Sequence, residues 1–473
     1  MLNEQNAITG KKRFSDESNV HYRIESVELI DTELLSNMIR NHQSQQVPRL
    51  KTLREYYKGN NEGILVSQRR REQHLADNRA THNFAKYVSQ FIQGYMVGVP
   101  LKTSYPDESV NELIRDINIE NDADEHNSDL VLDQSIYGRA YELVYRNQND
   151  ETRFATLDVT ETFVIYDETI ECKPIAAVRY FGSQWKKDGT VYLYTDNEIH
   201  VYALKDGNKL EKKDVMNHFF GAVPIVEYEN NKYRQGDFED VLSLIDLYDA
   251  SQSDTSNYMT DINDAMLMIK GNLDIDVEEA QEMKERNILM LQTETDADGK
   301  TTNADADYIY KKYDVAGTEA YKDRLFNNIL LFTSIPNLLN DKAERASQSG
   351  EALKMKLFAL SQKRATKERL FKKSLRDRYR LINNIMGVAS EGSFDVNEIS
   401  VTFTENLPSM VDKEIEWFIR AGGILSQRTL RENLSIVENA LEEERRVEEE
   451  REDADYPFAE IGDSNEESDV LEE

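Results

Sequence analysis

The chain has 473 residues, of which 39% are hydrophobic, enough for folded cores and for about three domains of roughly 150 residues each. Its formal net charge of −32 disfavours a protein that grips nucleic acid over its general surface, because phosphate binding needs Lys and Arg. An acidic wall would still let DNA slide past, since it repels a polyanion and keeps it from sticking. The single cysteine, Cys172, excludes an intramolecular disulfide framework, and we interpret it as a packing residue on a strand.

The N-terminal half changes from helical to strand-like patterns. Helical spacing dominates residues 27–57 and 79–95, and the second helix is expected to stop at Gly98 and Pro100. Residues 111–144 are again mostly helical. From about 139 to 229 the apolar period becomes two, which predicts one α+β domain with strands at 140–145, 162–166, 176–181, 190–194 and 199–204.

A long helix is predicted to begin at Gly236 and to run to about residue 270. Its apolar stripes are interrupted by many acids, among them Asp246, Asp249, Asp254 and Asp261. On an ordinary surface helix such acids would serve solvation. No apolar run near it approaches the ~20 residues that a membrane span needs.

Residues 271–313 have the pattern of a compact insertion. A helix is expected at 277–286, and strands at 288–293 and 308–311 around a polar loop. Residues 296–299, Asp-Ala-Asp-Gly, match the start of a calcium loop, but the later ligands and the closing glutamate are missing. A turn is the better interpretation, and no metal site is predicted.

The centre of the sequence is a helix, a break and a much longer helix. Apolar residues recur at helical spacing over 321–332, and Pro336 ends that run. No apolar period follows Leu339 until a new helix, for which Ser349 is a plausible N-cap. This second helix keeps its apolar spacing as far as Ile385, with a polar middle at 361–369.

The same long helix reverses the charge of the chain. Between Lys354 and Arg380 there are eleven Lys and Arg residues and two acids, a local net charge of +9. This basic belt would either meet DNA or an acidic neighbour, or pair with the acidic helix of the next copy. The residues singled out are Lys363, Arg364, Lys367, Lys372 and Arg376.

The C-terminal part returns to a strand and then to helices. Residues 399–403 are predicted to be a returning strand, and 411–441 to be helical with a break at Gly422-Gly423. Residues 441–473 carry sixteen acids and three arginines, so this tail is expected to be largely disordered.

Catalytic motifs are absent from the sequence. There is no Gly-x-x-x-x-Gly-Lys-Ser/Thr loop, no His-Glu-x-x-His and no Gly-x-Ser-x-Gly elbow, and the seven histidines are scattered. No catalytic residue, cofactor or metal is therefore predicted, and the chain is not expected to be an enzyme. Two rival functions remain open, a metal-dependent nuclease and an acidic adaptor that mimics DNA.

Three segments together resemble one protein family. They are Ser-Ile-Pro-Asn-Leu at 334–338 followed by Ser-Gly-Glu-Ala-Leu-Lys-Met-Lys-Leu at 349–357, the helix that ends in Gly-Val-Pro at 91–101, and Gly-Gly-Ile-Leu-Ser-Gln-Arg-Thr-Leu at 422–430. In this order and spacing they resemble the SPP1-type portal family of tailed bacteriophages, over roughly residues 30–440.

The resemblance implies an α+β portal fold that forms rings. It implies a β-rich wing at 1–235, a stem helix at 236–270, a small α/β clip at 271–313 and a second stem helix at 314–336. It further implies a tunnel loop at 337–350, a long kinked helix with a returning wing strand at 351–410, a helical crown at 411–452 and an acidic disordered tail at 453–473.

The resemblance also implies a function: a ring, twelve copies in virions, at one capsid vertex, which is the channel for packaging and ejecting double-stranded DNA. The implied partners are the terminase large subunit, the head-completion or adaptor protein of the head-tail connector, and the major capsid and scaffolding proteins, with no membrane. Assembly would occur in the bacterial cytoplasm. Some stem acids would line the channel, and the tunnel loop would meet DNA through Asn340, Asp341, Lys342, Glu344, Arg345, Ser347 and Gln348.

Overall fold

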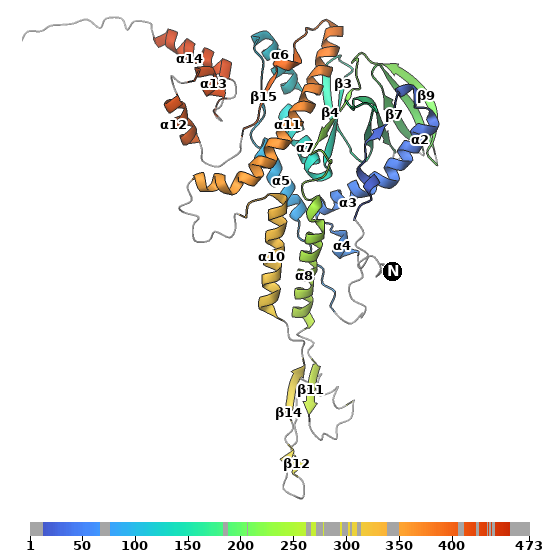
Figure 1. Ribbon diagram of the computed structural model, residues 1–473, viewed down its shortest axis with the longest axis vertical. Helices are drawn as coiled ribbons and strands as arrows, with labels where there is room; N and C mark the ends of the chain where they lie inside the picture. Colours follow the sequence, from blue (N-terminus) through green and yellow to red (C-terminus); the bar gives the residue numbers. More distant parts are fainter. Residues whose placement is uncertain are drawn as a thin grey trace, which may run out of the picture.

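The computed structural model describes residues 13–66, 76–182, 188–205, 207–261, 266–270, 314–337, 350–404, 411–421, 425–432 and 440–454, with a few shorter pieces between them. A broad body of helices and sheets carries two long helices that extend from it side by side toward a pair of short strands (Figure 1). The last three helices of the chain lie to the left of the body in this view (Figure 1). None of the described helices is long and apolar enough to cross a membrane.

The largest sheet has six strands in the order β1-β5-β6-β7-β8-β9. All its pairs are antiparallel except β1 with β5, and the buried residues Leu35 and Ile39 of helix α2 (Thr32–Asn41) pack against it. Its strands are β1 (Tyr22–Arg23), β5 (Thr162–Tyr166), β6 (Pro174–Phe181), β7 (Gly189–Tyr194), β8 (Glu198–Lys205) and β9 (Lys209–Asn217). The four strands predicted between 162 and 204 are confirmed, whereas β9 was missed because most of its residues are charged and exposed.

A second, three-stranded sheet has the order β10-β3-β4 and links the body to the long C-terminal helix. It comprises β3 (Arg139–Arg146), which confirms the predicted strand at 140–145, β4 (Thr152–Leu157) and β10 (Ile225–Glu229). Helix α7 (Ala123–Tyr137) leads into β3 through Gly138, whose φ of 83° suits glycine. A Cβ at Gly138 would lie 2.0 Å from the carbonyl oxygen of Arg234, so only glycine fits this turn.

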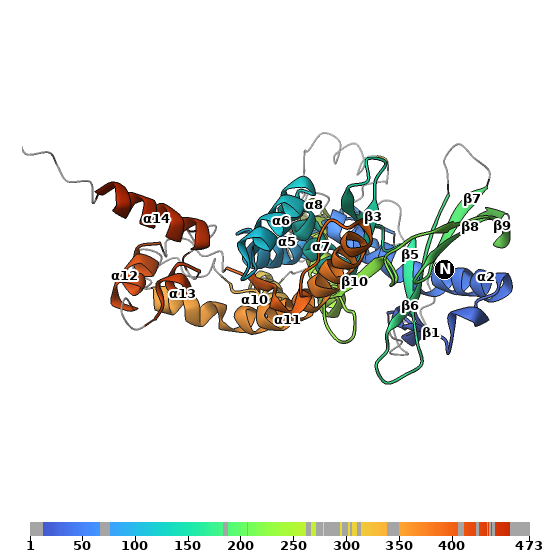
Figure 2. The same cartoon turned by 90° about the horizontal axis from the view of Figure 1, so that it is seen from above.

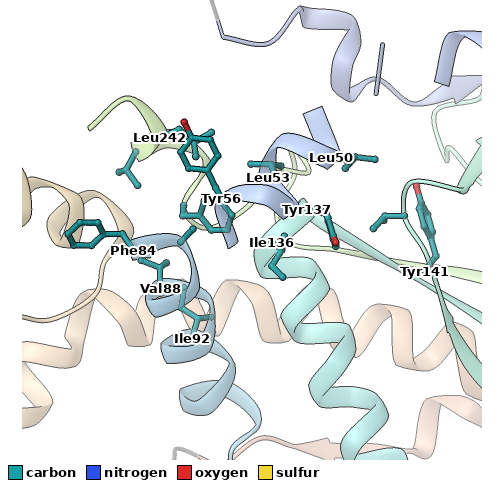
Figure 3. Packing of buried hydrophobic residues seen from close by; sticks show 14 of the residues in the cluster. Leu50, Leu53, Tyr56, Phe84, Val88, Ile92, Ile136, Tyr137, Tyr141 and Leu242 are labelled. Carbon is teal, nitrogen blue, oxygen red and sulfur yellow. The ribbon is translucent and has the colours of Figure 1, made fainter. Parts of the chain in front are cut away.

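The helices of the N-terminal region form the centre of the body. They are α2 (Thr32–Asn41), α3 (Val47–Lys58), α4 (Glu62–Leu65), α5 (Phe84–Val97) and α6 (Glu108–Glu120), with shorter turns at η1 (Asp16–Asn19), η2 (Val27–Leu29) and η3 (His42–Gln46). Helix α5 ends at Val97, as Gly98 predicts. Side chains of α3, α5, α7 and the start of α8 (Leu242–Asp261) turn toward one another in one buried cluster, with Tyr56 and Leu242 among them (Figure 3).

The first long helix is shorter than the sequence predicts. After the turn η4 (Glu239–Val241), α8 (Leu242–Asp261) ends nine residues before 270, and residues 266–270 form β11 (Met266–Lys270), paired antiparallel with β14 (Asp305–Ile309). The prediction of helix over 266–270 is therefore wrong. A short apolar run such as Met-Leu-Met-Ile has no period that separates a strand from a helix.

The insertion that follows is described only in pieces. Besides β11 and β14 these are β12 (Glu294–Thr295), which pairs with β13 (Thr301–Thr302). The predicted strand at 288–293 and most of the predicted helix at 277–286 lie outside the described residues. Helix α10 (Val315–Thr333) then begins with Asp314, whose side chain accepts the backbone N–H of Gly317, and returns along α8 (Figure 1).

Helix α11 (Gly350–Ala389) is a continuous helix of 40 residues whose start agrees with the Ser349 N-cap. It changes direction along its length: its first part crosses above α10, and its second part rises beside β3 (Figure 1). After η6 (Val396–Glu398), β15 (Ser400–Thr402) confirms the predicted strand. It pairs with β2 (Lys102–Ser104), not with the six-stranded sheet.

The C-terminal helices are α12 (Val411–Ala421), α13 (Gln427–Glu432) and α14 (Ala440–Ala454). Helix α12 ends at Ala421, and the predicted break at Gly422-Gly423 itself lies outside the described residues. The expectation of disorder from 441 is wrong as far as Ala454, because α14 occupies that stretch. Ion pairs between Arg431 and Glu444 and between Arg445 and Glu449 balance part of its acidic charge. Residues 455–473 lie outside the described part.

Candidate channel helices and their anchors

Helices α8 and α10 pack together, and an open groove follows their contact. Leu247, Asp254 and Tyr321 line this groove together with small side chains. Leu247 is 48% exposed and Tyr321 is 43% exposed, so the apolar faces of the two helices are only partly used within one subunit. A further surface is needed to cover them.

Asp249, one of the four acids singled out on α8, is fully buried. Its carboxylate accepts the backbone N–H of His82 at 2.9 Å, the ring Nδ1 of His82 at 2.9 Å, and the side-chain amide of Asn61. These bonds tie α8 to the segment that leads into α5. Because the carboxylate has no exposed surface, Asp249 is structural in the subunit and does not line a channel, contrary to the prediction for this residue.

Asp246 lies one turn earlier on α8 and is partly buried. It forms an ion pair with Arg13 and accepts a hydrogen bond from the Tyr56 hydroxyl. Burial, and then this hydrogen bond, raise the pKa of Tyr56 well above its usual range. Asp246 therefore holds the N-terminal segment and α3 against α8, and its carboxylate is paired with Arg13 inside the subunit.

The other two acids on α8 are placed differently. Asp254 is exposed and lines the groove beside α10. Asp261 is the last residue of α8, and its side chain lies outside the described part. Among the three acids whose side chains are described, Asp254 is thus the most exposed.

Two lysines of the basic belt point inward, where they meet one aspartate of their own chain. Lys363 Nζ lies 2.9 Å and Lys367 Nζ 2.6 Å from the carboxylate oxygens of Asp237, just before α8. Lys367 and Asp237 are buried. Although burial opposes ionisation, the two ammonium groups lower the pKa of Asp237 far below its usual range. The sequence left open whether the belt meets DNA or an acidic neighbour, or pairs with the next copy, and the structure pairs these two lysines within one copy.

The remaining belt residues divide between packing and exposure. Arg364 is buried, pairs with Glu368 at 2.6 Å, and lies 5.4 Å from the centroid of the Tyr95 ring. Lys372 lies 5.4 Å from the ring centroid of Phe403. Arg376 is exposed. The basic belt therefore divides between two faces of α11. The inward-facing basic residues anchor the helix to the body, and the others face outward.

A second buried ion pair, which the sequence analysis missed, joins α11 to β3. Arg378 donates from Nε to Glu142 at 2.9 Å and from a terminal nitrogen to Asn127 at 2.9 Å, and both partners of the ion pair have fully buried side chains. Burial opposes the charge of Glu142, yet Arg378 and then His126 lower its pKa to about 2. The available signal was a glutamate among the aliphatic and aromatic residues of 140–145. This pair fixes the position of α11 along its axis relative to β3.

Comparison with known proteins decides the family. The family described as "Phage portal protein, SPP1 Gp6-like" matches residues 36–456. The chain belongs to this family of phage portal proteins. The portal protein of Clostridium phage phiCD119 is 25% identical over 423 residues, covering 83% of this chain and 90% of the relative. The portal protein of Bacillus phage SPP1 is 23% identical over 455 residues, covering 89% of this chain and 86% of the relative.

One solved structure is also similar. It is titled "Neck of empty GTA particle computed with C6 symmetry", with 13% identity and a TM-score of 0.41, covering 74% of this chain and 89% of that one. This TM-score is too low to assign a shared fold. The family assignment rests on the sequence relationship.

The residues predicted for the portal tunnel loop lie outside the described part of the chain. This holds for Asn340, Asp341, Lys342, Glu344, Arg345, Ser347 and Gln348. The structure describes the two ends that hold the loop. Ser334 ends α10 in a left-handed conformation, and α11 begins at Gly350.

Large apolar side chains are exposed close to both ends of that loop. They are Leu331 and Phe332 on α10, 68% and 62% exposed, and Met355 and Phe358 on α11, 78% and 61% exposed. A monomer rarely leaves such a concentration of apolar surface uncovered, which marks this region as a contact surface.

A search for metal ligands among the described residues finds His21, Glu227 and Glu229 close together. Glu227 is already engaged, because it pairs with Arg234 at 2.6 Å and accepts the hydroxyl of Tyr166. Burial, and then the charge of Arg234, lower the pKa of His21 to about 4, which shows how unfavourable this place is for added positive charge. The set fits a buried ion-pair network and disfavours a cation.

Proposed function

We propose that this chain forms a closed ring at one vertex of a phage head, through which double-stranded DNA enters during packaging and leaves during ejection. The observation that carries this is the exposed apolar surface of Leu331, Phe332, Met355 and Phe358, on helices that one copy cannot cover. Membership of the portal family supports it. The ring has twelve copies, as the resemblance implies.

In this ring α8 and α10 form the wall of the channel, and the loop between α10 and α11 narrows it. The sheet-bearing body is the wing, the strands β11 and β14 belong to the clip, and α12 to α14 form the crown. The clip faces the terminase large subunit during packaging and the head-completion protein of the head-tail connector afterwards. The body meets the major capsid and scaffolding proteins during assembly in the bacterial cytoplasm.

The channel guides DNA and does not act on it chemically. The sequence contains no phosphate-binding loop, so the energy for packaging comes from ATP hydrolysed by the terminase. The purified chain is expected to show no ATPase or nuclease activity with Mg²⁺ or Mn²⁺. Turnover that disappears when one acid cluster is mutated would favour the metal-dependent nuclease.

Native mass spectrometry and negative-stain electron microscopy at micromolar concentration test the ring. We expect a holed ring for the unmodified chain, and strongly reduced assembly for Leu331→Ser with Phe332→Ser. Ile170→Ser is the matched control, because Ile170 is fully exposed on a turn of the six-stranded sheet and its loss should leave assembly unchanged. A monomer under all conditions would overturn the proposal and favour the acidic adaptor.

A further inference from the structure

Helix α6 carries a continuous acidic stripe on its outer face. Glu108, Glu112, Asp116 and Glu120 follow one another at intervals of four residues and are all exposed. At 1.5 Å per residue this acidic stripe is about 18 Å long. The opposite face of α6 packs into the hydrophobic core through Ile114. Arg115 lies 3.9 Å from Asp116 and offsets one of the four charges.

Helix α11 carries a basic stripe on its outer face. Arg369, Lys373, Arg376 and Arg380 are exposed at helical spacing and extend over about 16 Å. Asp377 pairs with Arg380 and offsets one charge, so the stripe keeps a net charge close to +3 against about −3 on α6. This stripe differs from the inward Lys363 and Lys367 of α11, which both pair with Asp237.

The two stripes cannot meet within one subunit. Helices α6 and α11 contact each other through their inner faces, where the Tyr379 hydroxyl donates to Asn118 at 3.1 Å. Their charged faces therefore turn away from this shared core. Seen from above, α6 lies along one side of the body, and the middle of α11 lies along the other (Figure 2). Each subunit thus presents an acidic stripe on one flank and a basic stripe on the other.

We propose that the acidic stripe of one copy docks against the basic stripe of the next copy around the ring. The inference rests on the proposed ring and names the surfaces that meet in it. The two stripes match in length, opposite charge and net magnitude. A contact between two different flanks is heterologous, which is the kind of contact that closes into a ring when the rotation fits.

The charges determine the direction of assembly more than its strength. Exposed ion pairs each contribute little, but like charges placed face to face are strongly unfavourable. Two copies that met through the same flank would bring acid against acid or base against base. The stripes therefore reject back-to-back pairing and favour head-to-tail order, in which every copy is oriented alike.

Reversing each stripe separately tests the contact. The first variant is Lys373→Glu with Arg376→Glu, and the second is Glu108→Lys with Glu112→Lys. Lys209→Glu with Lys212→Glu, on the exposed strand β9, is a matched control with the same charge change as the first variant. Assembly is measured by native mass spectrometry and sedimentation in 50 mM and 500 mM salt, and circular dichroism checks that each variant folds.

Each variant alone should assemble only at a protein concentration at least about tenfold higher than the unmodified chain in low salt, because every contact becomes repulsive. Higher salt should reduce this difference. An equal mixture of the two variants should restore rings, since alternating copies would place opposite charges at every contact. The control should assemble normally.

The outcomes separate this inference from the proposed ring. If the unmodified chain forms rings and both variants form them equally well, or if the mixture fails to assemble, the stripes do not meet. If the unmodified chain forms no ring, both proposals fail. If a double variant does not fold, the single changes Arg376→Glu and Glu112→Lys provide the same test, alone and mixed.

Discussion

Replacing Asp237 with alanine should destabilise the protein by about 3–5 kcal/mol, the usual cost of removing one partner of a buried ion pair. The change leaves Lys367, which is 2% exposed, charged and buried without its counter-ion. It also removes the weaker of two acceptors of the Asn230 side-chain amide, which donates to Asp237 at 3.2 Å and to the Gln235 carbonyl at 2.7 Å. Lys363 is 25% exposed at its side chain, so it can turn to water and should account for little of the loss.

The measurement is urea unfolding followed by circular dichroism at pH 7. Asp240→Ala is the control, because this neighbouring acid is exposed and its loss should change the free energy of unfolding by less than about 0.5 kcal/mol. Asp237→Leu combined with Lys367→Met should recover most of the lost stability, since replacing both partners with apolar groups leaves no buried charge.

The pH dependence follows from the direction of the pKa shift. Asp237 has a folded-state pKa below its unfolded value, so its stabilising effect is complete above about pH 4 and is lost as the pH falls below that. The difference in unfolding free energy between the unmodified chain and Asp237→Ala should therefore shrink between about pH 4 and pH 2. A difference below about 1 kcal/mol at pH 7, or one that grows on acidification, would refute the reasoning.

Three other changes have defined outcomes. Glu142→Gln should cost about 3 kcal/mol in urea unfolding, because Arg378 keeps its charge in a buried site; a loss below about 1 kcal/mol would show that this pair does not hold α11. Asp341→Lys with Glu344→Lys should leave the ring assembled by electron microscopy but lower the DNA packaged per head at low salt, with recovery at higher salt. Normal packaging by that variant at both salt concentrations would show that the loop does not contact the DNA. Deleting residues 455–473 should change neither urea unfolding nor ring assembly, because the segment is acidic and follows the end of α14. Loss of the ring would assign the segment a structural role.

The sequence predicted most elements of the fold because their periods are unambiguous. Alternation identified β3 and β5 to β8, and helical spacing identified α5, α10 and α11. It failed at β11, whose short apolar run fits either period. It also failed at α14, where composition indicated disorder but ion pairs support a helix. These failures occur where the local pattern is short or where charge outweighs periodicity.

The sequence predicted the candidate site less well, because spacing shows which residues share a helix but not which neighbours they face. Asp246, Asp249 and Asp254 are equivalent acids in the sequence. In the fold, Asn61 and His82 bury the carboxylate of Asp249, and Arg13 reaches Asp246 from the start of the described chain. These partners are more than 160 positions away along the sequence, so no local pattern could reveal them.

The distribution of buried charge changes what the channel surface can be. The net charge of −32 suggests acidic walls. However, the carboxylates of Asp237, Asp246 and Asp249 form ion pairs or hydrogen bonds with partners inside the subunit. Among the singled-out acids of α8 whose side chains are described, Asp254 is the most exposed. In the ring that we propose, the repulsion that keeps DNA from sticking then comes from exposed acids that are repeated from copy to copy. Repetition makes this sufficient, because one exposed acid per copy becomes a complete ring of like charges, which raises the potential inside a narrow channel.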